Sequence, residues 1–109
     1  MNRIALQNLF NKMCADGDLL AVKRMVKDET ISNKIKLQSG VFAAAETGQL
    51  EIEKFLIGEL GLDPTSSDYL ALLIAVGNGH RELVDYLLTD PRVDVNEAYR
   101  LVKMYEGEK

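Results

Sequence analysis

The sequence predicts an all-α solenoid of stacked helical hairpins, and this prediction rests on a repeat of 31 residues. Gly17, Gly48 and Gly79 lie 31 residues apart. An apolar residue stands four positions before each of these glycines: Met13, Ala44 and Ala75. A fixed period of this size is typical of repeat architectures, in which each unit packs only against its neighbours.

Each glycine is followed by a segment whose apolar residues form one helical stripe. The stripe positions are Ala21, Val22, Met25 and Val26 in the first unit, Ile52, Glu53, Leu56 and Ile57 in the second, and Leu83, Val84, Leu87 and Leu88 in the third. Such spacing places the side chains on one side of a helix. Glu53 is the exception, and we expect Phe55 to cover for it. The charged residues between the stripe positions are expected to face solvent.

A second apolar segment precedes each glycine, so each unit should fold as helix, glycine turn, helix. We expect helices near 3–14, 19–28, 37–46, 50–60, 67–77, 81–89 and 97–105, with little or no strand. The whole chain, 1–109, reads as one domain with units at 1–33, 34–65 and 66–96 and a terminal half-unit at 97–105. Asn96 is expected to cap the last helix.

The segments around the second and third glycines resemble the ankyrin repeat. The resemblance lies in residues 44–52 (AAETGQLEI) and 75–80 (AVGNGH), and in the closing elements at 62–65 (LDPT) and 93–96 (VDVN). No unit carries the Thr-Pro-Leu-His signature of that family, and the period is shorter than its usual 33 or so residues. The segment 63–69 is too short for a long hairpin. The resemblance therefore implies an ankyrin-like solenoid with shortened β-hairpin fingers; a tetratricopeptide array is the alternative.

Charge is unevenly distributed along the chain. Residues 1–36 carry seven basic and four acidic side chains, whereas residues 37–109 carry six basic and thirteen acidic ones, giving a net charge of −4. An acidic majority disfavours binding to a phosphate backbone, so a nucleic-acid partner is not expected. No apolar run is long enough to span a membrane. The single cysteine, Cys14, favours a reducing, cytoplasmic location.

No catalytic or metal-binding constellation is visible in the sequence, so we expect neither an enzyme nor a cofactor. The only histidine, His80, follows Gly79 at a repeat position where a structural role explains it. Cys14 lies two units away from His80, and Asp63 and Asp94 recur at the 31-residue interval as turn elements. A metal site would need several such ligands to converge.

The resemblance implies a partner protein bound along the concave face that first helices form. By position, this face would include seven candidate contact residues: Asp16, Gln38, Glu46, Tyr69, Asn78, Tyr99 and Arg100. Tyrosine is a favoured interface anchor. We expect a small stand-alone binder that masks or inhibits another protein. The alternatives are a self-assembling repeat scaffold and an acidic decoy for a nucleic-acid-binding enzyme.

Overall fold

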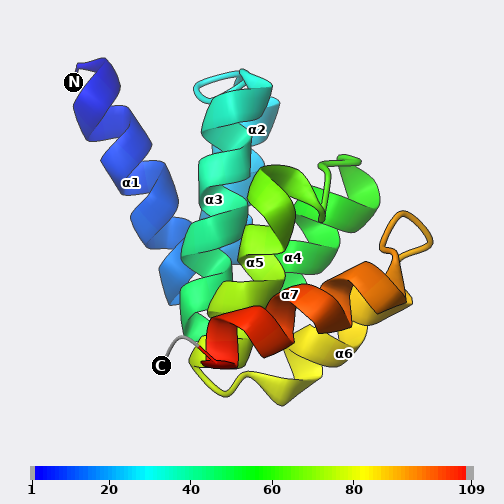
Figure 1. Ribbon diagram of the computed structural model, residues 1–109. Coiled ribbons are helices and arrows are strands. Elements are labelled where there is room, and N and C mark those ends of the chain that lie inside the picture. The colour runs from blue at the N-terminus through cyan, green and yellow to red at the C-terminus, as the bar shows by residue number, and fades with distance from the viewer. Residues whose placement is uncertain (1, 108–109) are drawn as a thin grey trace.

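The computed structural model describes residues 2–107, and these fold as a stack of helical hairpins (Figure 1). In order, the elements are α1 (Arg3–Asp16), α2 (Leu19–Lys27), α3 (Lys34–Thr47), α4 (Leu50–Glu53), the π-helical segment η1 (Lys54–Glu59), α5 (Ser66–Gly77), α6 (Arg81–Thr89) and α7 (Val95–Gly107). Residues 2–107 contain no strand. The predicted all-α solenoid with shortened fingers is thus confirmed.

The helices form two layers. The first helices of the units, α1, α3 and α5, pack side by side, and α7 packs against α5. The second helices α2, α4 with η1, and α6 form the other layer, and each packs against the first helix of its own unit. The resulting stack is elongated and extends to 42 Å along its longest axis but only 21 Å along its shortest.

The three repeat glycines end the first helices through the same backbone turn. Each adopts a left-handed conformation, with φ between 74° and 77°. The residue after each glycine donates its N–H to the carbonyl five positions back, at Met13, Ala44 and Ala75. This is the Schellman arrangement, which favours glycine because a Cβ is unfavourable at positive φ. The predicted helix-joining turns are therefore confirmed, and the repeated apolar residues supply their acceptors.

The residue after the glycine also joins one unit to the next. Gln49 Nε2 donates to the carbonyl of Ala15 over 3.1 Å. In the tautomer protonated at Nε2, His80 donates to the carbonyl of Glu46 over 2.8 Å. Asp18 holds the same position in the first unit, and its carboxylate caps α2 by accepting from the N–H of Ala21.

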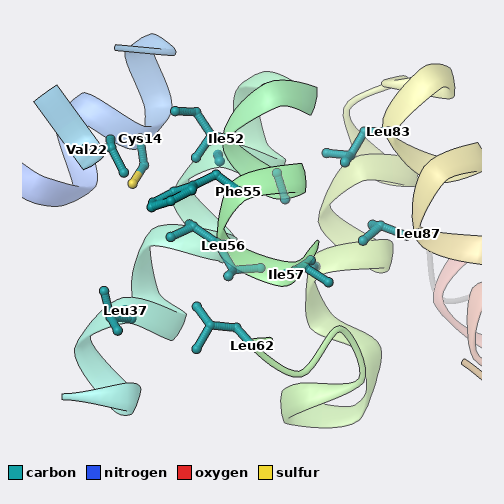
Figure 2. Close-up of a cluster of buried hydrophobic side chains, with 14 of the residues drawn as sticks. Cys14, Val22, Leu37, Ile52, Phe55, Leu56, Ile57, Leu62, Leu83 and Leu87 are labelled. Carbon is teal, nitrogen blue, oxygen red and sulfur yellow. The ribbon is translucent and has the colours of Figure 1, made fainter. Parts of the chain in front are cut away.

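The core runs through the middle of the stack. Figure 2 shows Ile52, Leu56 and Ile57 between Cys14 and Val22 on one side and Leu83 and Leu87 on the other. All seven side chains are almost fully buried. The interior is thus continuous across unit boundaries, as expected of units that bury their apolar sides against one another.

The predicted helix 50–60 is present but changes its winding within the second unit. The α-helix ends at Glu53 and a π-helix follows from Lys54 to Glu59. Glu53 occupies its place in the stripe and is fully buried, although neither carboxyl oxygen has a hydrogen-bond partner. Phe55 is buried beside it rather than in its place. Burial raises the pKa of Glu53 well above its usual range because the charged form is desolvated.

The third unit begins with an unusual backbone. Ser67, Asp68 and Tyr69 all adopt positive φ between 54° and 65°. This conformation is costly for residues with a Cβ. The turn places the Tyr69 hydroxyl 3.1 Å from the backbone N–H of Asp94, from which it accepts a hydrogen bond. The start of α5 is thereby connected to the turn that precedes α7.

The prediction that Asn96 caps the last helix is wrong. Helix α7 already begins at Val95, so Asn96 lies inside its first turn. Asp94 is the capping residue, because its carboxylate accepts from the N–H of Glu97 and its carbonyl accepts from Ala98. An aspartate is as good a cap as an asparagine. Within residues 2–107, no helix is both long and apolar enough to cross a membrane.

Candidate functional site

A hollow opens on the first-helix layer between α3 and the start of α5. Its volume is about 520 Å³, and it is lined by Lys34, Ile35, Gln38, Ser39, Phe42, Ser66 and Ser67. We call this the α3–α5 hollow. It lies on the layer where the resemblance placed partner contacts. Its walls combine two large apolar side chains, three hydroxyl groups, an amide and one cation.

The start of α3 presents the apolar wall. Asn33 caps this helix by accepting from the N–H of Ile35, so the helix begins three residues before the predicted position. Ile35 falls in the first turn and is 81% exposed, the highest fraction for any large apolar side chain described. Phe42 lies two turns later and packs partly against the core. An exposed isoleucine beside a half-buried aromatic ring can receive an apolar side chain of another molecule.

Two polar side chains of this hollow are held by hydrogen bonds to other segments. Gln38 Nε2 donates to the carbonyl of Asp63 over 3.2 Å, and the Ser39 hydroxyl accepts from Asn11 Nδ2 over 2.9 Å. Gln7 stands 31 residues before Gln38 and donates to the carbonyl of Lys36 in the second unit. Because the amide nitrogen of Gln38 is held at the end of its own unit, its amide oxygen is presented in a defined position.

Three of the predicted contact residues lie at the other end of the first helices. Asp16 is exposed and forms an ion pair with Lys12 over 2.6 Å. Glu46 is exposed, and its carbonyl is hydrogen-bonded to His80 Nε2. Asn78 uses its amide to donate to the carbonyl of Ile74 over 2.8 Å. These three side chains therefore form a row along the glycine turns, away from the α3–α5 hollow.

The other predicted residues lie near the C-terminal helix. Tyr99 is 56% exposed and borders a small hollow between α5, α6 and α7. Arg100 is exposed and ion-paired with Glu97 on the same helix. Tyr69 is half-buried, and its hydroxyl is used by the Asp94 N–H. The seven predicted residues thus fall into separate groups, and only Gln38 lines the α3–α5 hollow.

Ile35 is not among the contact residues predicted from the sequence. A signal was nevertheless present, because Arg3-Ile4 and Lys34-Ile35 recur at the 31-residue interval with a glutamine three positions later. Ile4 is 73% exposed, close to the value for Ile35. A basic residue followed by an apolar one at two equivalent helix starts, both left uncovered, marks an outward-facing surface.

The titratable groups in the interior do not form a reactive site. Cys14 is fully buried, and desolvation raises the pKa of its thiol to about 12, with the buried Glu53 carboxyl contributing in the same direction. A thiol in this state is a poor nucleophile. Among residues 2–107, no group of three or more His, Cys, Asp or Glu side chains is arranged to hold a metal ion.

Comparison with known proteins agrees with the repeat and with the helical stack. The sequence profile described as ankyrin repeats (3 copies) matches residues 10–98. No curated protein and no solved structure matches the chain. The profile covers most of the 109 residues, including all three glycine turns and the residues Gln49 and His80 that follow two of them. The chain therefore belongs to the ankyrin repeat family.

Proposed function

We propose that this protein is a small binder that masks or inhibits another protein by engaging it along the first-helix layer. Ankyrin repeats generally mediate protein–protein interaction. The observation that carries the finer proposal is the α3–α5 hollow, where a largely exposed Ile35 stands beside Phe42 and Gln38. Interfaces gain most of their affinity from a few anchors that fill such hollows.

The chemistry of the α3–α5 hollow favours a partner segment with an apolar side chain next to a carboxylate. The apolar side chain would lie between Ile35 and Phe42, and Lys34 is the one charged residue lining the hollow. The hydroxyls of Ser66 and Ser67 add hydrogen-bond capacity at the opposite wall. A few placed polar groups around an apolar floor are typical of specific recognition sites.

We further propose that the protein acts without catalysis and in a reducing compartment. The free, buried Cys14 supports the reducing compartment, because its thiol packs in the core without forming a disulfide. The uneven charge supports one competing function, which is self-assembly of the basic first unit with the acidic remainder. The acidic surface also leaves the decoy function as a third possibility.

The test is a binding assay on two sets of variants, with folding checked by circular dichroism. The first set, Ile35→Asp and Gln38→Ala, changes the α3–α5 hollow. The second set, Lys23→Glu, Arg24→Glu and Lys27→Glu, reverses charges on the exposed side of α2. Loss of a true anchor should weaken binding by about 2 kcal/mol, and the α2 set should have a much smaller effect. Loss confined to the α2 set would show that the partner binds the opposite layer.

Tyr99→Ala and Arg100→Ala form a third set that tests the contacts predicted near α7. Tyr69 is a poor probe, because its hydroxyl supports the backbone at Asp94 and its removal would perturb the fold. The competing functions have their own readouts. Self-assembly predicts a molecular mass that rises with concentration and falls with salt, whereas a decoy predicts competition between this chain and nucleic acid for one enzyme.

A further inference from the structure

A second recessed surface runs along α6, on the side of the third unit that faces away from the second. It consists of two hollows of about 260 and 180 Å³ that share Val76 and Val84. We call their union the α6 groove. Its lining includes Val76, Gly79, Val84, Leu88, Tyr99 and Val102, so it is largely apolar, and Arg81 and Asp85 add one charge of each sign.

The equivalent positions one repeat earlier show how this surface is covered elsewhere in the stack. The positions 31 residues before Val76, Val84 and Leu88 are Ala45, Glu53 and Ile57. All three are at most 1% exposed, whereas Val76, Val84 and Leu88 are only partly buried. The difference arises because the third unit, with α6 as its second helix, packs against α4. The same surface one unit later has no such cover among residues 2–107.

The glycine turns show the same difference at atomic detail. A Cβ added to Gly48 would lie 2.6 Å from the His80 ring, which sits directly on this turn. A Cβ added to Gly17 would lie 2.4 Å from the Gln49 amide in the same way. A Cβ added to Gly79 would meet no atom within 4 Å. The place on Gly79 that corresponds to those of Gln49 on Gly17 and His80 on Gly48 is therefore open.

Helix α7 takes the place of a first helix and leaves the second-helix place free. It packs against α5 and contributes Ala98, Tyr99 and Val102 to one wall of the groove. Tyr99 remains 56% exposed at this wall. The opposite side of the groove is formed by α6, whose exposed Arg81 and Asp85 line it. Asp85 forms no ion pair within the described part of the chain.

We propose that the α6 groove binds an amphipathic helix of a partner protein, which takes the place that the next second helix would occupy. The groove is the continuation, by one repeat, of an interface that α4 and α6 already form. Its occupant should therefore resemble α6, with two leucine-like side chains four residues apart and a glutamine or histidine at its N-terminus above Gly79. Lysine or arginine on its flank would complement Asp85. This surface is separate from the α3–α5 hollow.

A second copy of this chain fits the groove less well than a foreign helix. Its α2 is the second helix with an uncovered outer side, but α1 of that copy would then fall on α7, which already fills the first-helix place. A single helix of another protein does not meet this obstacle.

The test uses the full chain, labelled with ¹⁵N, and a synthetic peptide as the probe. The peptide copies residues 79–94 with Glu82→Lys and Asp85→Lys. Saturable shifts of backbone resonances should centre on Gly79, Val84, Leu88 and Val102 at peptide concentrations up to about 1 mM. Absence of shifts in this range, or shifts centred on the α3–α5 hollow, would overturn the proposal.

Two controls keep the result interpretable. In the protein, Leu88→Glu should weaken peptide binding at least about tenfold, while Leu20→Glu, at a 71% exposed position on α2, should leave it unchanged. In the peptide, replacing its copies of Leu83 and Leu87 by serine should abolish the shifts even if Leu88→Glu perturbs folding. Equal binding by the serine peptide, or loss on Leu20→Glu alone, would contradict the proposal. Self-association abolished by Leu88→Glu would assign the groove to a second copy instead.

Discussion

The boundary between the second and third units and the outer side of the third unit are built from equivalent residues but differ in their environment. At the boundary, Gly48 lies under the His80 ring and Glu53 is fully buried. One unit later, Gly79 faces open space and Val84 is half-exposed. The comparison shows that a repeat position has no fixed role. The neighbouring unit determines whether the position belongs to the core or to a surface available for binding.

The largest effect should come from placing a larger side chain at a position that is fully buried in both the second and the third unit. Ala75 is fully buried in α5, and its carbonyl accepts from the N–H of His80. We expect Ala75→Leu to lower the free energy of unfolding by up to about 3 kcal/mol, because the neighbouring helices leave no room for the larger side chain.

Val84→Leu is the matched control in the same unit, because Val84 faces the α6 groove, where space is available. Its effect should stay within about 0.5 kcal/mol. Urea denaturation of both variants measures the difference. A similar loss for both would mean that the groove is as closed as the core.

The next effect concerns the buried carboxyl at the boundary. Glu53→Leu should raise the free energy of unfolding at neutral pH by about 2 kcal/mol, because it removes two buried oxygens that have no partner. The measurement is chemical denaturation at a series of pH values.

The pH dependence follows from the sign of the pKa shift. Since burial raises the pKa of Glu53 in the folded state, the folded protein retains a proton that the unfolded chain loses above about pH 4.3. The stability of the parent protein should be fullest below that pH and decline as pH rises through the folded-state pKa. The advantage of Glu53→Leu should therefore grow with pH. An advantage that is constant with pH would show that the carboxyl is charged or solvated in the folded state.

A smaller effect should come from the hydrogen bonds that join the units. His80→Ala and Gln49→Ala each remove one side-chain bond to the carbonyl of the preceding unit. Each should lower the free energy of unfolding by about 1 kcal/mol. Asp18→Ala is the comparison variant, since it removes a helix cap of similar value without touching a unit boundary. The rate of amide hydrogen exchange at residues next to Glu46 and Ala15 should increase only in the first two variants. Unchanged exchange rates in these two variants would show that the hydrogen bonds of His80 and Gln49 do not stabilise the boundaries between units.

The regular part of this fold could be predicted from the sequence because it follows from local rules. A glycine at a fixed interval predicts a left-handed turn, and an apolar stripe predicts a helix, so the positions of Gly17, Gly48 and Gly79 were correct. The capping residue of α7 was misassigned because Asp94 and Asn96 are both good caps and only the observed helix start separates them.

Other features depend on contacts between units that no local pattern contains. The periodicity of the sequence predicted neither the π-helix after Glu53 nor the left-handed turn at Ser67–Tyr69. Ile35 was missed because the predicted helix began at 37, whereas α3 begins at Lys34 and presents Ile35 in its first turn. The hydrogen bonds of Gln49 and His80 could have been found, because both follow a repeat glycine directly.

The most direct test of the central comparison is the pair of substitutions Gly48→Ala and Gly79→Ala, measured by equilibrium denaturation. Both glycines have φ near 75°, so each variant should lose about 1 kcal/mol from backbone strain. Gly48→Ala should lose at least about 1 kcal/mol more, because its Cβ must displace the His80 ring. In the background His80→Ala, this additional loss should disappear. Equal losses for the two variants in the parent protein would contradict the claim that the third unit ends in an open copy of the boundary between the second and third units.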